Sequence, residues 1–188
     1  MSAPAITLSP PVTDLDHADG PATARVTLVE YGDYECPVCA ETFATLQQVR
    51  RAFGPNLRVV FRHFPLRSSH PHALAAAKAA EAAGAQGKFW PMHERLFQHQ
   101  TQLADADLLR HARKLGLDLE RFQRDMASRT AEVRIREDLA SGSRSGVNGT
   151  PTLFIDGERY TGPRDRVSLI DALARAAIAA TRSGALHA

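Results

Sequence analysis

The sequence has few cysteines, no long apolar run and no block of like charge. Its 188 residues include two cysteines, whereas a secreted scaffold held together by disulfides would have more of them, spread along the chain to close long loops. The 23 basic and 21 acidic residues give a net charge of +2. No run of five or six like charges marks a nucleic-acid-binding arm, so we expect no nucleic-acid partner.

Targeting and membrane signals are also missing from the sequence. Residues 1–23 lack the basic start and the apolar core of a secretory signal peptide. The alanine-rich runs are short and interrupted by charged residues, so none is long enough to cross a bilayer as a helix. Together with the initiating Met1, these absences predict a cytoplasmic protein that does not insert into membranes.

The residues that are present describe an ordinary folded domain. Apolar residues make up 44% of the chain and charged residues 23%, which is typical of globular proteins. Residues 1–24 are rich in Pro, Asp and Thr and predict an extended N-terminal leader, with an edge strand near Ile6–Leu8. The regular fold is expected to begin after this leader.

Hydrophobic periodicity predicts a β-α-β unit at residues 25–64. Residues 25–31 are β-branched and apolar, which indicates a buried strand. Apolar residues then recur at three- and four-residue steps from Pro37 to Phe53, which predicts an amphipathic helix that Gly54 and Pro55 end. Residues 57–64 read as a second strand. In one sheet this order implies parallel pairing and a right-handed crossover.

The rest of the chain predicts an all-helical block, a hairpin and a last helix. Residues 65–145 contain almost no strand-like alternation and show four or five helical patterns. Residues 152–161 predict a β-hairpin around Asp156-Gly157, and a helix is expected at about 164–182. The fold class is therefore α/β, with one domain formed by residues 25–64 and 146–183 and interrupted by an inserted helical subdomain at 65–145.

The two cysteines stand together at the start of the first predicted helix, in Cys36-Pro37-Val38-Cys39. Cysteines at positions i and i+3 of a helix have Cα atoms about 5–6 Å apart, within the usual disulfide span of about 4.4–6.8 Å. If Cys36 is the N-cap, Pro37 takes a position whose N–H needs no partner, and free N–H groups point toward the Cys36 sulfur. Those donors and the helix dipole stabilise a thiolate.

Other uses of the cysteine pair remain open at this point. Half of a zinc site and two incidental thiols are the alternatives to a redox pair. Zinc would need two more ligands, and the nearest candidates, His63, His70 and His72, lie beyond a complete predicted helix and strand. A Cu(I) chaperone would need only the two thiolates. We expect no metal at the site.

Two further features carry chemistry. Thr150-Pro151 stands directly before a strand, where proline is awkward; either a cis peptide bond or a trans proline that begins the strand explains it. Glu30 lies inside an otherwise apolar strand, six residues before Cys36. It is either a strand-end acid that reaches solvent or a buried carboxyl whose burial raises its pKa.

The order of elements and these three motifs resemble the DsbA-like family of thioredoxin-fold thiol-disulfide oxidoreductases. The resemblance extends from Val26 to the last helix. It implies a cis Thr150-Pro151 bond across from the cysteines, and a Thr150 backbone that docks an extended substrate segment as a strand would. It also implies that Glu30 relays protons for the buried cysteine.

The resemblance therefore implies disulfide exchange with protein thiols and disulfides, with Cys36 as the nucleophile and Cys39 as the resolving thiol. The reaction requires no organic cofactor. It does require an electron-transfer partner, which the sequence does not identify. Two alternatives stay open: a Zn- or Cu-binding thiol module, and a glutathione-using relative of the same fold that would not need Cys39. The direction of electron flow is undetermined.

Several residues near the pair affect its expected reduction potential and its surroundings. The strongly oxidising DsbA has histidine where this chain has Val38, which can neither donate a hydrogen bond nor supply a positive charge, so we expect a milder couple. The acids Asp33 and Glu35 are expected to be solvated loop residues. His93 and His99 are expected to be packing or surface residues.

Overall fold

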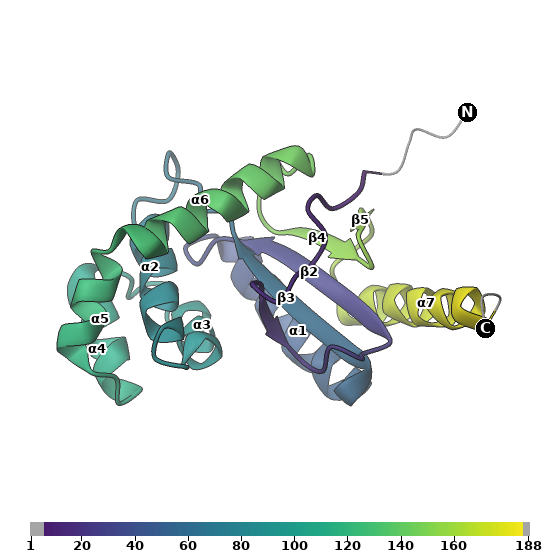
Figure 1. Ribbon diagram of the computed structural model, residues 1–188, viewed down its shortest axis with the longest axis horizontal. Helices are drawn as coiled ribbons and strands as arrows, with labels where there is room; N and C mark the ends of the chain where they lie inside the picture. Colours follow the sequence, from purple (N-terminus) through teal and green to yellow (C-terminus); the bar gives the residue numbers. More distant parts are fainter. Residues whose placement is uncertain (1–5, 186–188) are drawn as a thin grey trace.

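The computed structural model describes residues 6–185, with side chains through residue 180. A five-stranded mixed sheet lies at its centre, in the order β1-β3-β2-β4-β5, and helices surround it (Figure 1). The strands are β1 (His17–Asp19), β2 (Val26–Gly32), β3 (Leu57–His63), β4 (Thr152–Ile155) and β5 (Glu158–Tyr160).

The predicted β-α-β unit forms as expected. Strands β2 and β3 pair in parallel along their whole length, with Val26 opposite Leu57 and Gly32 opposite His63, and helix α1 (Pro37–Phe53) connects them through the short 3₁₀ turn η1 (Gly54–Asn56). Gly54 ends α1 with a positive φ of 54°, a conformation that glycine adopts without a steric penalty. The unit places the start of α1 at the end of β2.

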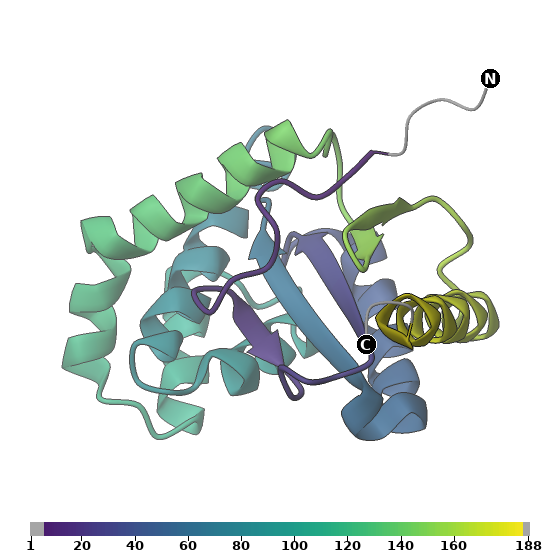
Figure 2. The ribbon, with the colours of Figure 1, turned by 45° about the vertical axis from the view of Figure 1, so that its right-hand side comes forward.

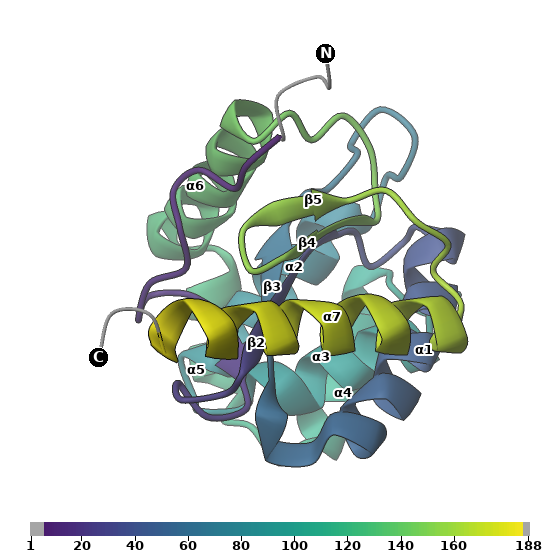
Figure 3. The same cartoon turned by 90° about the vertical axis from the view of Figure 1, so that its right-hand side faces the viewer.

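The predicted hairpin pairs with the other side of β2. Strand β4 is antiparallel to β2 and to β5. Asp156 and Gly157, between the two strands, both have positive φ, 46° and 84°, as a two-residue hairpin turn requires. Helix α7 (Arg166–Ala185) follows, and together with α1 it covers one face of the sheet through Leu46, Val49, Leu169 and Leu173. Figure 3 shows α7 crossing in front of the strands.

The N-terminal leader spans the opposite face of the sheet from edge to edge (Figure 2). Near the β5 edge, where a strand was expected, Thr7 forms a single bridge with Glu158, and Leu8 N donates to Gly157 O at 2.8 Å. At the other edge, residues 17–19 form β1, antiparallel to β3, which the sequence pattern did not predict. Residues 1–5 lie outside the described part of the chain.

The long stretch between β3 and β4 is helical, as predicted. It consists of α2 (Ala73–Gly84), α3 (Phe89–Gln98), α4 (Asp105–Lys114), α5 (Leu119–Met126) and α6 (Arg129–Arg144). Seven alanines of α2 are buried, and their small side chains let the neighbouring helices approach closely. A single apolar cluster runs from this helical block to Cys39 and Phe43 of α1 and Phe61 of β3. The insertion and the sheet therefore share a core at the cysteine pair.

Candidate active site

The cysteine pair occupies the first turn of α1. Cys36 is the N-cap, with extended backbone angles, and Pro37 stands at the first helical position, where its missing N–H leaves no donor unpaired. The N–H of Cys39 reaches the carbonyl of Cys36 at 3.1 Å. Both thiols are free; Cys36 is 6% exposed and Cys39 is completely buried. Only Cys36 therefore has access to a substrate.

The loop before β4 faces this turn. The Thr150-Pro151 peptide bond is cis, and Cys36 Sγ lies 3.5 Å from the Thr150 carbonyl oxygen. The Thr152 hydroxyl donates to Gly149 O at 2.8 Å, which ties the loop back onto itself. Segments 114 residues apart in the sequence thus meet at one sulfur atom.

The two thiols have opposite electrostatic environments. A hydrogen bond from Cys39 is the largest influence on the pKa of Cys36, and it lowers that pKa. Burial raises the pKa, whereas contacts with Thr150 and with the backbone N–H groups of Cys39 and Val38 lower it further. The result is a pKa of about 5. Burial raises the pKa of Cys39 far above its usual range. At neutral pH the accessible sulfur is a thiolate and the buried sulfur is a thiol.

Glu30 lies in the middle of β2, paired with Phe61 on one side and Leu153 on the other. It is 2% exposed, so the strand-end alternative is wrong, and its Oε1 has no hydrogen-bond partner among the described residues. Burial, with a smaller contribution from the charge of Cys36, raises the pKa of Glu30 to about 8. A buried carboxyl with this pKa can hold or release a proton near neutral pH.

A small cavity of about 10 Å³ adjoins Glu30, close to the space that one water molecule needs. Its walls come from β2, β3, α1 and α3, including Phe43, Trp90 and His93. His93 is buried, its Nδ1 is hydrogen-bonded to the Tyr34 hydroxyl at 3.1 Å, and burial lowers its pKa well below the usual value. His93 is thus a packing residue, as expected.

The expectation that Asp33 is solvated is wrong. Asp33 is 2% exposed because the loop after β3 folds over it: its Oδ2 accepts from the Leu66 N–H at 2.8 Å and contacts His70 Nδ1 at 2.7 Å. These hydrogen bonds replace the lost hydration. Despite partial burial, contacts with Asp33 and the charge of Cys36 raise the pKa of His70, so a positive charge is favoured beside the cysteine turn.

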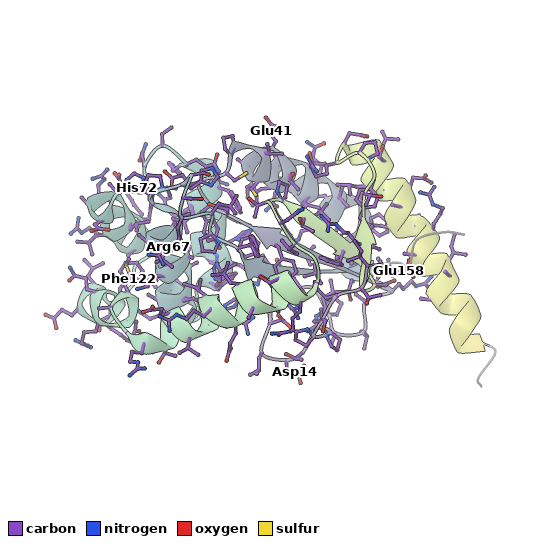
Figure 4. All side chains as sticks on the ribbon, turned by 90° about the horizontal axis from the view of Figure 1, so that it is seen from above. Asp14, Glu41, Arg67, His72, Phe122 and Glu158 are labelled. Carbon is purple, nitrogen blue, oxygen red and sulfur yellow. The ribbon has the colours of Figure 1, made fainter. Side chains whose placement is uncertain are left out.

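Two other contacts hold the same turn. Glu35 is partly exposed and pairs with His72 Nδ1 at 2.9 Å. Figure 4 labels His72. Gln100, which follows α3, donates from Nε2 to Tyr34 O at 2.8 Å and to Cys36 O at 2.9 Å. Sequence reasoning missed Gln100, since no motif distinguishes one glutamine after a helix.

The histidines weighed as zinc ligands lie in other contacts. His70 and His72 pair with Asp33 and Glu35, and His63 Nε2 is 2.8 Å from Glu81 Oε1. Among the residues that the structure describes, no group of three or more metal-ligating side chains includes either cysteine. A zinc site needs such a group, whereas Cu(I) would need only the two thiolates.

Comparison with known proteins identifies the family. The model of the thioredoxin family matches residues 13–174. The chain belongs to the thioredoxin family. It is 34% identical to a thioredoxin-like oxidoreductase from Silicibacter pomeroyi DSS-3, with a TM-score of 0.78 over 87% of this chain and 93% of that one.

More distant structures confirm the expected DsbA-like fold. The thiol-disulfide exchange protein α-DsbA2 from Wolbachia pipientis is 23% identical, with a TM-score of 0.75 over 86% of this thioredoxin-family chain and 88% of that one. BdbD from Bacillus subtilis is 20% identical, with a TM-score of 0.77 over 92% and 98% of the two chains. At these identities the likeness concerns the fold, including its helical insertion.

Curated relatives are much longer proteins. The chain is 47% identical over 169 residues to Na(+)/H(+) antiporter NhaA 1 of Salinispora arenicola (strain CNS-205), a match to 90% of this chain and 26% of the relative. Na(+)/H(+) antiporter NhaA of Herminiimonas arsenicoxydans is 45% identical over 159 residues, 84% of this chain and 25% of the relative. The chain spans about a quarter of these relatives. No helix in its described part is long and apolar enough to cross a membrane.

Proposed function

We propose that this thioredoxin-family protein is a thiol-disulfide oxidoreductase that exchanges disulfides with protein substrates through Cys36 and Cys39. The observation that carries the proposal is the asymmetry of the pair. One sulfur is accessible and has a pKa of about 5, and its partner one turn away is buried and protonated. A thiolate is the attacking form of cysteine, and a thiol held in reserve beside it can resolve the mixed disulfide.

In the reducing direction, the Cys36 thiolate attacks one sulfur of a substrate disulfide. A mixed disulfide forms, and the second substrate sulfur leaves as a thiolate. Cys39 then gives up its proton and attacks Cys36 Sγ, which closes the Cys36–Cys39 disulfide and releases the first substrate sulfur as a thiolate. Oxidation of a substrate dithiol is the same sequence reversed. Each cycle moves two electrons, so an electron-transfer partner is required to restore the pair.

Glu30 is the proposed proton acceptor for Cys39. It is buried near the pair, its pKa of about 8 is influenced by the charge of Cys36, and the pKa of Cys39 is in turn raised by the charge of Glu30. The attack of Cys39 on the mixed disulfide requires the Cys39 proton to leave. A carboxyl whose pKa lies near neutral pH, beside a small cavity, can accept that proton. The reaction needs no organic cofactor.

The Thr150-Pro151 loop is the proposed substrate-docking segment. The Thr150 carbonyl oxygen lies 3.5 Å from Cys36 Sγ, so a peptide that forms backbone hydrogen bonds with this loop would carry its cysteine to the attacking sulfur. Pro37 and Val38 are both exposed on the rim of the same turn. Backbone pairing recognises an extended segment whatever its side chains, so we propose broad specificity for unfolded or loop substrates.

Two assays test the proposal together. Insulin reduction measures turnover, and equilibration with glutathione buffers measures the reduction potential. We expect a potential between those of thioredoxin (about −270 mV) and DsbA (about −120 mV), because a pKa of about 5 stabilises the reduced form less than the pKa of about 3.5 in DsbA. The measured potential, set against that of its compartment, gives the direction of flow. The cytoplasmic location stays a prediction.

A Cys39→Ser variant separates the alternatives. In the two-cysteine mechanism it loses turnover and accumulates the mixed disulfide on Cys36. Full turnover with glutathione would instead favour a glutathione-using relative. Metal analysis of reduced protein, purified without oxygen, tests the remaining alternative: stoichiometric Zn or Cu lost in both single cysteine variants would overturn the proposal.

A further inference from the structure

Away from the cysteine pair, two histidines and a glutamate converge where the leader meets the helical insertion. His17 belongs to β1, His63 ends β3 and Glu81 lies in α2. The Nε2 atoms of His17 and His63 are 2.7 and 2.8 Å from the same oxygen, Glu81 Oε1, and the three ligand atoms lie within 4.8 Å of one another. Figure 2 shows β1 at the sheet edge beside β3, next to the insertion.

Aromatic rings fix both imidazoles in this orientation. The His17 ring stacks on Phe89, with centroids 3.5 Å apart and planes 7° apart, and the His63 ring meets Phe61 edge-on at 5.4 Å. The side chains of His63 and Glu81 are 1% and 12% exposed, and that of His17 is 21% exposed. The ligand atoms are therefore already held close together by the fold, and this preorganisation favours binding.

We propose that His17, His63 and Glu81 form a Zn²⁺ site. Two imidazoles and one carboxylate are a ligand set that zinc uses with a fourth, non-protein ligand. Glu81 Oε1 already faces Nε2 of both imidazoles. Zinc bonds of about 2.0–2.2 Å place tetrahedral ligand atoms roughly 3.3 Å apart, so the two nitrogen-to-oxygen separations open by about half an ångström on binding.

A cavity of about 360 Å³ supplies the open side of the site. His17 and Glu81 form part of its wall, and Arg121 and Asp125 of α5 form another part. Asp125 Oδ2 is buried and has no hydrogen-bond partner among the described residues, although Arg121 Nε is 3.4 Å away. The fourth, non-protein ligand of zinc would occupy this cavity.

The same contacts limit the expected affinity. Zinc binds neutral imidazole, so each Nε2 proton that now faces Glu81 has to leave, and each ring then carries its proton on Nδ1. Nδ1 of His63 is buried and has no hydrogen-bond partner among the described residues. A missing partner on the second nitrogen typically costs about 10–100-fold in metal affinity. We therefore expect binding about 10–100-fold weaker than at a zinc site whose second imidazole nitrogens are paired.

Oxidised protein provides the test, because the Cys36–Cys39 disulfide removes the competing thiolates. Zinc uptake is measured by competition with a chromophoric chelator. We expect one equivalent bound to the wild type, and at least about tenfold weaker binding in His17→Gln and in Glu81→Gln. His17→Gln keeps an amide donor for Glu81, so it removes the ligand and preserves the hydrogen bond. His99→Gln is the matched control, since His99 has a histidine neighbour, His111, at 5.3 Å.

Two results would overturn the site. One is uptake of less than a tenth of an equivalent by oxidised wild-type protein; the other is equal affinity in His17→Gln and the wild type. Zinc-edge X-ray absorption on the wild type gives a readout that does not depend on a variant's folding: we expect nitrogen and oxygen ligands at about 2.0–2.2 Å, and a sulfur shell near 2.3 Å would contradict the assignment. His17→Gln should retain insulin reduction, which keeps this site separate from the disulfide chemistry.

Discussion

The chemistry of Cys36 depends on the few groups that contact its sulfur. With valine at position 38, the dipeptide between the cysteines supplies one backbone N–H donor, that of Val38, and no side-chain donor. The first cause of the low pKa is instead the hydrogen bond from Cys39, with Thr150 as a further contributor. The reactivity of this site is therefore built from the resolving thiol and the opposite loop, both of which are already needed for exchange.

We predict that Cys39→Ala raises the pKa of Cys36 from about 5 toward its ordinary value, because it removes the strongest donor to the thiolate. The rate of alkylation of Cys36 by iodoacetamide, measured against pH, reports the thiolate fraction. In the wild type the rate should rise with an inflection near pH 5, and in the variant the inflection should move upward. An unmoved inflection would show that the backbone N–H groups alone depress the pKa.

At Glu30, burial makes stability depend on pH. The pKa of about 8 in the folded protein lies above the unfolded value of 4.5. When folding raises the pKa of a group, the protein keeps its full stability below the pKa of the unfolded state. That stability is lost as the pH rises through the pKa of the folded state. The full shift of about 3.5 units corresponds to a cost of roughly 5 kcal/mol at pH 8 and above.

Glu30→Gln should remove this cost. Urea unfolding of the reduced protein is expected to show a variant more stable than the wild type by several kcal/mol at pH 8 and by less than about 1 kcal/mol at pH 5. Glu41→Gln, on the exposed face of α1 (Figure 4), is the matched control and should change neither value. A difference that does not grow with pH would contradict the buried, raised carboxyl.

Among the elements, the leader is held in part by a buried ion pair between Asp16 and Arg62. Asp16 contacts the Arg62 guanidinium twice, from Nε to Oδ1 at 2.8 Å and from Nη2 to Oδ2 at 3.0 Å, and both side chains are 3% exposed. Arg62 also donates to the carbonyls of Pro10 and Pro11 at 3.1 Å. This side chain of β3 thus adds to the backbone contacts that hold the leader at the two sheet edges.

Asp16→Asn should destabilise the protein by about 3–5 kcal/mol, because it leaves the Arg62 charge buried without its partner. Thermal or urea unfolding measures the loss at pH 7, and Asp14→Asn, exposed two residues earlier, is the control. Burial opposes the ionisation of Asp16, but Arg62 lowers its pKa, so wild-type stability should fall as the pH drops through that lowered pKa. Equal stability of the two variants would show that the leader is anchored elsewhere.

The elements that the sequence predicts are those with sustained periodicity. The strand before the cysteines, the helix that carries them and the Asp156-Gly157 hairpin each have a pattern or a turn signal of their own. Strand β1 has neither, since its three residues are polar or small and become a strand only by pairing with β3. The burial of Asp33 was equally invisible, because its partners Leu66 and His70 lie more than thirty residues further along the chain.

At the scale of the molecule, the active site joins the two parts of the fold. The cysteine turn belongs to the thioredoxin-like part, whereas Gln100, His70 and His72 reach it from the inserted segment that follows β3. The boundaries of that insertion, 65 and 145, remain a proposal. Because the insertion contacts the backbone of Cys36 itself, the geometry of the thiolate depends on how the two parts pack.

The oxidation state should therefore change the stability of the whole fold. The pKa of Cys36 is about 5 in the folded protein, against 9.0 as its ordinary value. A lowered pKa adds stability above the unfolded value, and this stability is lost as the pH falls through the folded one. At pH 7 the reduced protein should be more stable than the disulfide form by up to about 3 kcal/mol from this source.

Urea unfolding of both forms between pH 4 and pH 8 measures this difference. The thiolate's contribution should be largest at pH 8 and should vanish near pH 4, where Cys36 is protonated in folded and unfolded chains alike. Cys36→Ser removes it and should give a stability relative to the disulfide form that no longer rises over this range. If the difference in unfolding free energy between the reduced and disulfide forms of the wild type does not depend on pH, the fold does not stabilise the Cys36 thiolate. The reduction potential would then not be raised by that thiolate either.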